Sequence, residues 1–196
     1  LGHWPTPLEP MKGMARRLGT DRLYIKRDDC TGLATGGSKT RKLEFLVGEA
    51  VRQGADTLLT QGAVQSNHVR QTGAAAAFMG LACEAILEER VQGAPAAYHE
   101  SGNVLLDHLF GIPLHRVPAG TAMDAALEAL AQKLRAQGRK PYVIPGGGSN
   151  ALGSLGYVDC VLELQRQCDA MGLRKPHLVH ATGSAGTQAG LVAGVH

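Results

Sequence analysis

The stretch TLLTQGAVQSNHVRQTGAAAAFM, from Thr57 to Met79, decides the fold class of this chain. Its first four residues, Thr57–Thr60, form a β-prone run, and a polar loop then leads into a helical pattern at Asn67–Met79. The same alternation continues along the chain, with strands predicted at Cys83–Leu87, Leu114–Val117 and Tyr142–Ile144 and helices at Gly102–Phe110 and Thr121–Gln137. Such alternation indicates parallel strands joined by right-handed crossovers, so we predict a four-stranded α/β unit over residues 51–145.

Further elements lie on both sides of this unit. Before it, Leu23–Ile25 is a predicted strand, and a helix starts at Lys39 and ends at Gly54, where a C-terminal cap belongs. After it, we predict a helix over Leu155–Met171, a strand over His177–Ala181 and a helix beginning at Thr187. These outer parts cannot close a core alone, so we expect residues 1–50 and 146–196 to belong to one larger, incomplete domain into which 51–145 is inserted. We also expect the chain to be part of a longer protein, since it starts without Met and stops inside an apolar stretch.

Composition excludes several classes of protein. The chain of 196 residues is 44% hydrophobic and carries a net charge of +3, which is typical of a globular protein and excludes disorder and collagen. No apolar run approaches the roughly 20 residues of a membrane span, so no membrane association is expected. The basic residues are dispersed and only 4% of residues are aromatic, which argues against a nucleic-acid partner.

The cysteines and histidines indicate a protein of a reducing compartment that has no metal site. The four cysteines form no Cys-x-x-Cys pair, and the first 30 residues lack the layout of a secretory signal, so we predict a cytoplasmic location. The closest histidine pair, His177 and His180, has no carboxylate or thiol company. We therefore predict no metal site.

Three glycine-rich loops are candidate ligand sites. The first, Gly32–Thr40, resembles a phosphate-binding P-loop, but Ser38 separates the last Gly from Lys39 and rotates the lysine away. The second, Gly146–Ala151, satisfies G-x-G-x-x-A yet lacks the acidic residue expected after the next strand, and it reads equally well as a turn with Asn150 capping a helix. The third, Thr182–Thr187, could wrap a phosphate at a helix N-terminus or be a plain tight turn.

Two further groups of side chains are candidate site residues: the lysines at the start of a helix, and Gln65–His68. At the start of a helix, the positive end of the helix dipole lowers the pKa of a lysine such as Lys39, whereas Lys42, one turn later, fits an ordinary solvent-facing lysine. Polar residues Gln65–His68 follow a predicted strand at the carboxyl edge of a parallel sheet, where α/β proteins bind ligands. Within them, Asn67 could instead be a helix N-cap and His68 a structural histidine.

Four motifs in order resemble one family. They are KRDDCTGLATGGSKTRKLE (Lys26 to Glu44), QSNHVRQ (Gln65 to Gln71), YVIPGGGSN (Tyr142 to Asn150) and TGSAGT (Thr182 to Thr187). Together they are similar to the pyridoxal-phosphate-dependent D-cysteine desulfhydrase and 1-aminocyclopropane-1-carboxylate deaminase family, which includes L-cysteate sulfo-lyase. The resemblance covers nearly the whole chain, and it implies the tryptophan-synthase-β fold type, with two three-layer α/β domains and mostly parallel sheets.

The resemblance also implies roles for individual residues. Lys39 would carry pyridoxal 5'-phosphate as a Schiff base and Asn67 would hydrogen-bond the ring's phenolic oxygen. The loop residues Thr182, Gly183, Ser184, Ala185, Gly186 and Thr187 would hold the phosphate. The substrate would be bound by Gln65, Ser66, Asn67 and His68, and Ser66 would meet its carboxylate or assist proton transfer. The family usually has Asn where this chain has Ser38, a departure that could loosen the loop without removing the chemistry.

The expected reaction is a β-elimination on a small amino acid. Residues 27–37 look most similar to the desulfhydrases and cysteate sulfo-lyases, so we expect carbon–sulfur cleavage of D-cysteine or L-cysteate to pyruvate, ammonia and sulfide or sulfite. One alternative is 1-aminocyclopropane-1-carboxylate deaminase. Another, from a different class, is a truncated chain without catalytic activity. The family resemblance implies a homodimer.

Overall fold

The computed structural model describes all 196 residues, and its centre is a four-stranded parallel sheet. The strands are β3 (Thr57–Ala63), β4 (Ala82–Glu89), β5 (Leu114–Pro118) and β6 (Pro141–Val143), in the order β5-β4-β3-β6. Each pairs with its neighbour in parallel, with Thr57 opposite Ala82 on one side and opposite Pro141 on the other. The predicted α/β class and parallel sheet are therefore confirmed.

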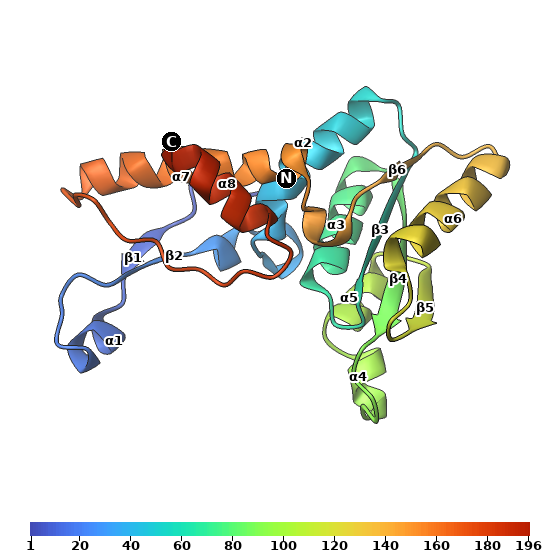
Figure 1. Ribbon diagram of the computed structural model, residues 1–196, viewed down its shortest axis with the longest axis horizontal. Coiled ribbons are helices and arrows are strands. Elements are labelled where there is room, and N and C mark those ends of the chain that lie inside the picture. Colours follow the sequence, from blue (N-terminus) through green and yellow to red (C-terminus); the bar gives the residue numbers. More distant parts are fainter.

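Helices cover both faces of this sheet. The helices of the unit are α3 (Asn67–Met79), α4 (Ala96–Glu100), α5 (Asn103–Leu109) and α6 (Met123–Ala136). Figure 1 shows α6 on one side of the strands and α3 and α5 on the other. Along β3, Leu58 joins the core beneath α3 while Leu59 packs with Leu127 of α6. Neighbouring residues on one strand thus pack on opposite faces of the sheet, as a sheet buried on both sides requires.

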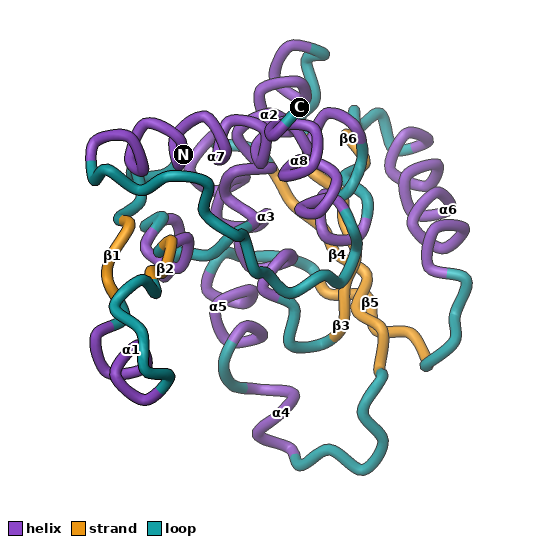
Figure 2. Tube along the Cα trace, turned by 60° about the vertical axis from the view of Figure 1, so that its left-hand side comes forward, coloured by secondary structure: helices purple, strands orange, loops and turns teal.

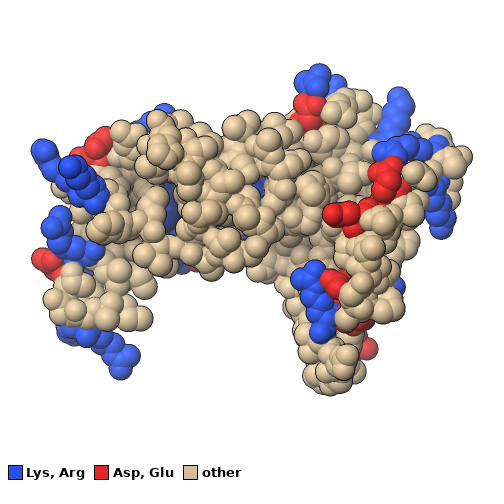
Figure 3. Space-filling model, viewed as in Figure 1, with Lys and Arg blue, Asp and Glu red and all other residues tan.

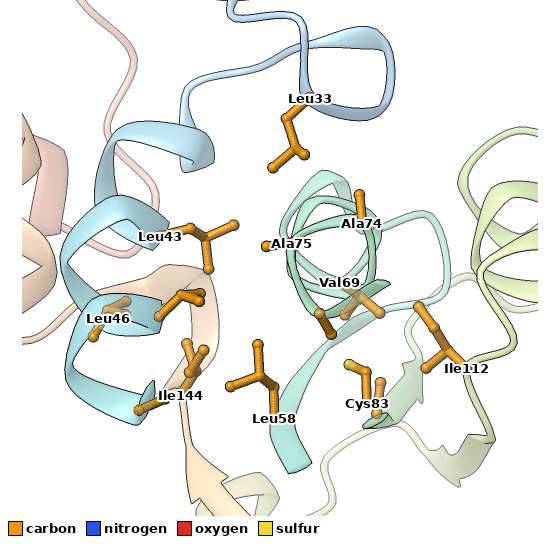
Figure 4. Packing of buried hydrophobic residues seen from close by; sticks show 14 of the residues in the cluster. Leu33, Leu43, Leu46, Leu58, Val69, Ala74, Ala75, Cys83, Ile112 and Ile144 are labelled. Carbon is orange, nitrogen blue, oxygen red and sulfur yellow. The ribbon is translucent and has the colours of Figure 1, made fainter. Parts of the chain in front are cut away.

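The helix that begins at Lys39 packs on the same core. This helix, α2 (Lys39–Arg52), contributes Leu43, Leu46 and Val47 to the larger hydrophobic cluster. Figure 4 shows Leu43 between α2 and Ala75 of α3, with Leu58 of β3 nearby. The backbone leaves α2 through Gly54, whose φ of +69° is the left-handed conformation expected of a C-terminal cap. Lys39 is consequently held in place by the buried face of α2, which packs on this core.

The outer segments form a helical layer and a small ribbon. They comprise β1 (Leu8–Pro10), α1 (Lys12–Arg17), β2 (Tyr24–Lys26), α7 (Ala151–Ala170) and α8 (Gly186–Val195), with 3-10 turns at Asp28–Cys30, Leu33–Thr35 and Gly146–Gly148. β1 and β2 pair antiparallel, with Leu8 opposite Lys26. α2 and α8 pack closely on α7: a Cβ on Gly156 would lie 2.2 Å from the carbonyl oxygen of Arg41, and one on Gly190 2.2 Å from that of Ser154.

One expectation differs from the structure here, and three short elements were not predicted. The segment predicted as a strand, His177–Ala181, is irregular, and Figure 2 shows the whole connection from α7 to α8 as a loop. No strand lies beside it to pair with, and the side chain of Val179 is almost fully exposed, so the β-prone sequence has neither partner nor core. The sequence pattern also missed β1, α1 and α4, which are three to six residues long and too short to show a period.

Charged side chains gather toward the ends of the molecule. Figure 3 shows Lys, Arg, Asp and Glu mainly at the two ends of the view, with the middle of that face largely free of them. No helix combines the length and the apolar character needed to cross a bilayer. Nor do three or more His, Cys, Asp or Glu side chains converge anywhere as metal ligands would.

Candidate functional site

Lys39 lies at the first residue of α2, between two cavities. A cavity of about 580 Å³ lies between β2, α7 and the connection leading to α8, and a second of about 370 Å³ lies at the carboxyl end of β3. Lys39 and Ser184 line both. The Lys39 Nζ has one hydrogen bond, to the Ser38 hydroxyl at 3.2 Å, and burial lowers the pKa of the amine. The site therefore holds a lysine that loses its proton more easily than a surface lysine.

Ser66 and Asn67 face this lysine from the start of α3. Ser66 is the N-cap, where its Oγ accepts a hydrogen bond from the Val69 amide at 3.2 Å, so its own hydrogen remains free to donate. The Asn67 Oδ1 accepts a bond from Asn103 at 3.0 Å, which leaves Nδ2 as a free donor. Both residues line the smaller cavity. The sequence pattern allows Asn67 as the N-cap of this helix, whereas in the structure the cap is Ser66, one residue earlier.

His68 is buried and held neutral. Its Nε2 lies 2.8 Å from the Thr60 hydroxyl, which in turn donates to the carbonyl of Ile144 at 2.9 Å. Burial, followed by the nearby charges of Lys39 and Lys42, lowers the pKa of His68 to about 3, while the carbonyl of Pro145 opposes the shift. A positive charge on His68 is therefore strongly disfavoured. The ring links α3 to β3 through the Thr60 hydroxyl, and His68 lines the smaller cavity.

Gln65 lies outside both cavities. Its Nε2 donates to the carbonyls of Tyr98 and Ser101 at 2.7 and 2.9 Å, and its Oε1 accepts from the Asn103 amide at 2.9 Å. Every polar atom of this side chain is thus committed to the segment joining α4 and α5. The structure brings Ser66, Asn67 and His68 together with Lys39 but turns Gln65 away.

The loop Thr182–Thr187 lies across the site and ends at the N-terminus of α8. Ala185 takes a left-handed conformation with φ +62°, and Gly186 begins the helix. The Ser184 hydroxyl lies 2.7 Å from that of Ser149. A Cβ on Gly186 would lie 2.5 Å from the Ser149 Oγ, so only glycine fits there without displacement. The unpaired amides of the first turn of a helix favour an anion at this position.

Lys42 also belongs to the site, contrary to the expectation of a solvent-facing lysine. Lys42 is only 1% exposed, and its Nζ donates to the Gly147 carbonyl at 3.1 Å and to the Ser149 hydroxyl at 3.0 Å. The same amine is 2.9 Å from where a Cβ of Gly186 would lie. Burial, and then the charge of Lys39, lowers the pKa of Lys42 to about 8. The sequence held one signal for this burial. Lys42 lies three residues after Lys39 and four residues before Leu46, on the buried side of the helix.

The second glycine loop forms part of the same wall. The Gly147 carbonyl is bonded to Lys42, and a Cβ on Gly147 would lie 2.4 Å from the Ser184 Oγ. Asn150 accepts from the Gly153 amide at 2.8 Å, which confirms its role as the cap of α7. Gly146–Gly148 therefore supports the loop before α8.

These residues fit pyridoxal phosphate. A desolvated lysine suits imine formation, while a helix N-terminus with a buried second ammonium suits a phosphate. The Asn67 Nδ2 is a free donor for a ring oxygen, and the combined cavities are of the size that small ligands occupy. The arrangement can hold an aldehyde cofactor by both ends.

Comparisons with known proteins agree with this geometry. The family model described as pyridoxal-phosphate dependent enzyme matches residues 1–196. D-cysteine desulfhydrases of Salmonella paratyphi B and Salmonella newport are each 52% identical over 192 residues, which covers 97% of this chain and 58% of those proteins. The chain therefore spans 58% of the length of these curated relatives.

Solved structures give the same result. The crystal structure of an ACC deaminase homologue superposes with a TM-score of 0.84 at 40% identity, covering 100% of this chain and 57% of that one. Escherichia coli diaminopropionate ammonia lyase superposes with a TM-score of 0.70 at 18% identity, covering 99% of this chain and 56% of its own. The second likeness concerns the fold alone.

Proposed function

Because this chain belongs to the family of pyridoxal-phosphate-dependent enzymes, we propose that it supplies the reactive site of a lyase acting on small β-substituted amino acids. The proposed reaction is the cleavage of D-cysteine with water to pyruvate, ammonia and hydrogen sulfide, or of L-cysteate to pyruvate, ammonia and sulfite. The observation that carries it is the position of Lys39 between two cavities, with the loop before α8 on one side and the start of α3 on the other.

Lys39 is proposed as the residue that holds the cofactor covalently and later moves the proton. Its lowered pKa increases the fraction of neutral amine that can attack an aldehyde. When bound, pyridoxal phosphate supplies an electron sink that stabilises negative charge on the α-carbon of an attached amino acid. The amine of Lys39, when free, would accept the proton from the α-carbon of the substrate, and the sulfur group would leave from the β-carbon.

The phosphate is assigned to the loop Thr182–Thr187 with Lys42 beneath it. Backbone amides at the start of α8 and the Ser184 hydroxyl supply donors, while Lys42 supplies a buried positive charge. A dianion placed here would raise the pKa of Lys42 above its value of about 8 and keep the amine charged. The phosphate site thus gains a charge-assisted hydrogen bond at neutral pH.

The substrate's carboxylate is assigned to the start of α3. Ser66 and the first residues of the helix line the smaller cavity, where the positive end of the helix favours an anion, and the Ser66 hydroxyl can still donate a hydrogen bond. Asn67 would hold the phenolic oxygen of the cofactor ring through Nδ2. His68, neutral and buried, would support this wall without exchanging protons.

The choice of substrate follows from the relatives. The curated relatives named above are D-cysteine desulfhydrases, which favours carbon–sulfur cleavage, and L-cysteate is kept as a second sulfur substrate. The structural likeness at 40% identity to an ACC deaminase homologue supports 1-aminocyclopropane-1-carboxylate deamination as the alternative. The two activities differ in the bond broken, since deamination opens a ring and releases no sulfur.

The direct test is product release from three substrates. Purified protein is incubated with pyridoxal phosphate and D-cysteine, L-cysteate or 1-aminocyclopropane-1-carboxylate, and sulfide, sulfite, ammonia and keto acid are measured. We expect sulfur release and pyruvate in equal amounts, abolished in Lys39→Ala and retained in Lys133→Ala, whose lysine is on the exposed side of α6. Ammonia and keto acid without sulfur, from the cyclopropane substrate only, would establish the deaminase instead.

The non-catalytic alternative has a separate test. A chain that cannot hold the cofactor gains no thermal stability from it, whereas a true site is stabilised by RT ln(1 + [L]/Kd). We expect the unfolding midpoint to rise with pyridoxal phosphate concentration. No shift at millimolar cofactor would favour the non-catalytic reading.

Assembly, location and domain division are proposed with the same function. We infer a homodimer in the cytoplasm, the latter supported by four cysteines that form no disulfide. The proposed division assigns residues 51–145 to a smaller domain and 1–50 with 146–196 to the larger cofactor-binding one. Light scattering of the purified protein tests the dimer, and limited proteolysis tests the division.

A further inference from the structure

One face of α3 contacts the backbone on both sides of Lys39. Arg70 and Gln71, three and four residues after Asn67, are both buried and both reach residues 34–40. Residues i, i+3 and i+4 of a helix share a face, so Asn67, Arg70 and Gln71 form one surface. We call Arg70 and Gln71 the α3 clamp.

Arg70 holds the segment before Lys39. One guanidinium nitrogen donates to the carbonyls of Ala34 and Gly36, the latter at 3.1 Å, and to the Thr35 hydroxyl at 3.1 Å. Ala34 and Thr35 have positive φ angles of 45° and 68°. Such conformations cost free energy for residues with a Cβ and persist only where surrounding contacts enforce them. Arg70 supplies those contacts.

Gln71 holds the residue after Lys39. Its Oε1 accepts from the Thr40 amide at 3.0 Å and from the Thr40 hydroxyl at 3.1 Å, while its Nε2 donates to the Asn67 carbonyl at 2.8 Å. A Cβ on Gly37 would lie 2.6 Å from the Gln71 Nε2, so the loop passes directly over this amide. The side chain thus ties the first turn of α2 to the first turn of α3.

The clamp also fixes the side chain of Asn67. The Arg70 Nε donates to the Asn103 Oδ1 at 2.7 Å, and the Asn103 Nδ2 donates to the Asn67 Oδ1 at 3.0 Å. Burial lowers the pKa of Arg70, and the nearby Asp107, buried on α5, opposes this shift without cancelling it. One connected set of contacts therefore reaches both the lysine loop and the residues proposed to face it.

We propose that Arg70 and Gln71 are positioning residues that set the place and the desolvation of the Lys39 amine relative to Ser66 and Asn67. The proposal rests on the role given to Lys39 above. The geometry requires a guanidinium at position 70, because its Nε bonds Asn103 while a second nitrogen bonds the Ala34 and Gly36 carbonyls, and a single ammonium cannot donate in both places. It predicts that loosening the clamp changes the chemistry of Lys39 more than it changes the fold.

The first experiment examines the lysine without the cofactor. In the full chain, Arg70→Gln and Arg70→Lys are compared with wild type and with Arg135→Gln, which removes an exposed arginine of α6. Hydrogen exchange is followed for residues 31–40, and the pH midpoint for chemical labelling of Lys39 is measured by mass spectrometry. We expect faster exchange in this segment and a higher midpoint in both Arg70 variants, because a looser loop exposes the amine to water.

The second experiment separates positioning from binding in the cofactor-loaded protein. For Arg70→Lys we expect kcat to fall by about 100-fold while KM changes little, since misplacement by about 1 Å has an effect of that size. Gln71→Glu, close in shape but without the amide donor, is expected to act in the same direction. Arg135→Gln should match wild type in both constants.

The outcomes distinguish this proposal from the proposed function. The clamp proposal is overturned if a folded Arg70→Lys protein shows wild-type hydrogen exchange in residues 31–40 and an unchanged pH midpoint for Lys39 labelling, whatever its activity. If Arg70→Gln does not fold, the Arg70→Lys measurement alone decides. If wild type never attaches pyridoxal phosphate but both readouts still shift, the clamp stands and the role assigned to Lys39 fails.

Discussion

Lys39 and Lys42 lie one helical turn apart, but their amines have different surroundings. Lys39 reaches the junction of two cavities, where burial alone lowers its pKa. Lys42 donates to the Gly147 carbonyl and the Ser149 hydroxyl beside the loop before α8. One amine is thereby available for reaction and the other for holding an anion.

Replacing Lys42 should weaken cofactor binding without removing covalent attachment. In Lys42→Met the buried charge beside the phosphate loop is lost, and we expect affinity for pyridoxal phosphate to fall about tenfold or more, on the scale of a charge-assisted hydrogen bond. Fluorescence titration with cofactor measures it. In wild type, affinity should also decline as pH rises above about 8, where the free Lys42 amine loses its proton. An affinity equal to that of wild type, with the same pH profile, would remove Lys42 from the phosphate site.

Asp107 should destabilise the protein at neutral and alkaline pH. Its carboxylate oxygens are buried without a hydrogen bond, and burial raises its pKa from 3.8 to about 7, with Arg70 opposing the shift. Between these values the folded state binds more protons than the unfolded state, so this group's contribution to stability falls as pH rises and levels off above about 7. We expect Asp107→Asn to unfold at a higher temperature than wild type at pH 8 and at a similar one at pH 4. A lower midpoint at pH 8 would show that the charge is needed beside Arg70.

Among the elements, α8 depends on a close approach at its first residue. A Cβ on Gly186 would lie 2.5 Å from the Ser149 hydroxyl and 2.9 Å from the Lys42 amine. Gly186→Ala should therefore displace the loop and reduce cofactor affinity. The matched control is Gly48→Ala on the exposed side of α2, where nothing lies within 4 Å of the added Cβ. That control should stabilise the helix by about 0.5–1 kcal/mol and leave cofactor titration unchanged. Equal cofactor affinity in the two variants would contradict the packing argument.

Elements with a clear period could be predicted from the sequence. The helix at Asn67–Met79 has the predicted bounds, and the core of the strand at Thr57–Thr60 is right, because alternation and cap residues are local signals. The failure at His177–Ala181 has a different cause, since a strand forms only where another strand accepts its hydrogen bonds. Among site residues, local sequence could place Ser66 and Asn67 at a helix start, but the burial of Lys42 and the diversion of Gln65 depend on partners 105 and 33 residues away.

At the scale of the whole molecule, a buried ionic network joins the outer segments. Arg41 of α2 is 2% exposed and bonds to Asp28 at 2.8 Å and to Glu163 of α7 at 3.0 Å. Lys26 of β2 pairs with the same Glu163, and the Arg41 guanidinium lies 4.4 Å from the Trp4 ring. The N-terminal ribbon and α7 are thereby fastened to the helix that carries Lys39.

Breaking this network should have a large effect on stability. Arg41→Met leaves the buried carboxylate of Glu163 and the partly buried one of Asp28 without their common partner, and we expect a loss of about 3–5 kcal/mol in the free energy of unfolding. Urea denaturation measures it, with Arg135→Met as the exposed control, for which a change of about 1 kcal/mol or less is expected. Similar losses in both variants would mean that the network contributes no more than a surface ion pair.

The account depends most directly on where pyridoxal phosphate becomes attached. Protein incubated with the cofactor is reduced with borohydride, digested and mapped by mass spectrometry, in wild type, Lys39→Ala and Lys42→Met. We predict one labelled peptide carrying the pyridoxyl group on Lys39, absent in Lys39→Ala and present at lower occupancy in Lys42→Met. Stoichiometric label on another lysine, or label that survives in Lys39→Ala, would contradict the account.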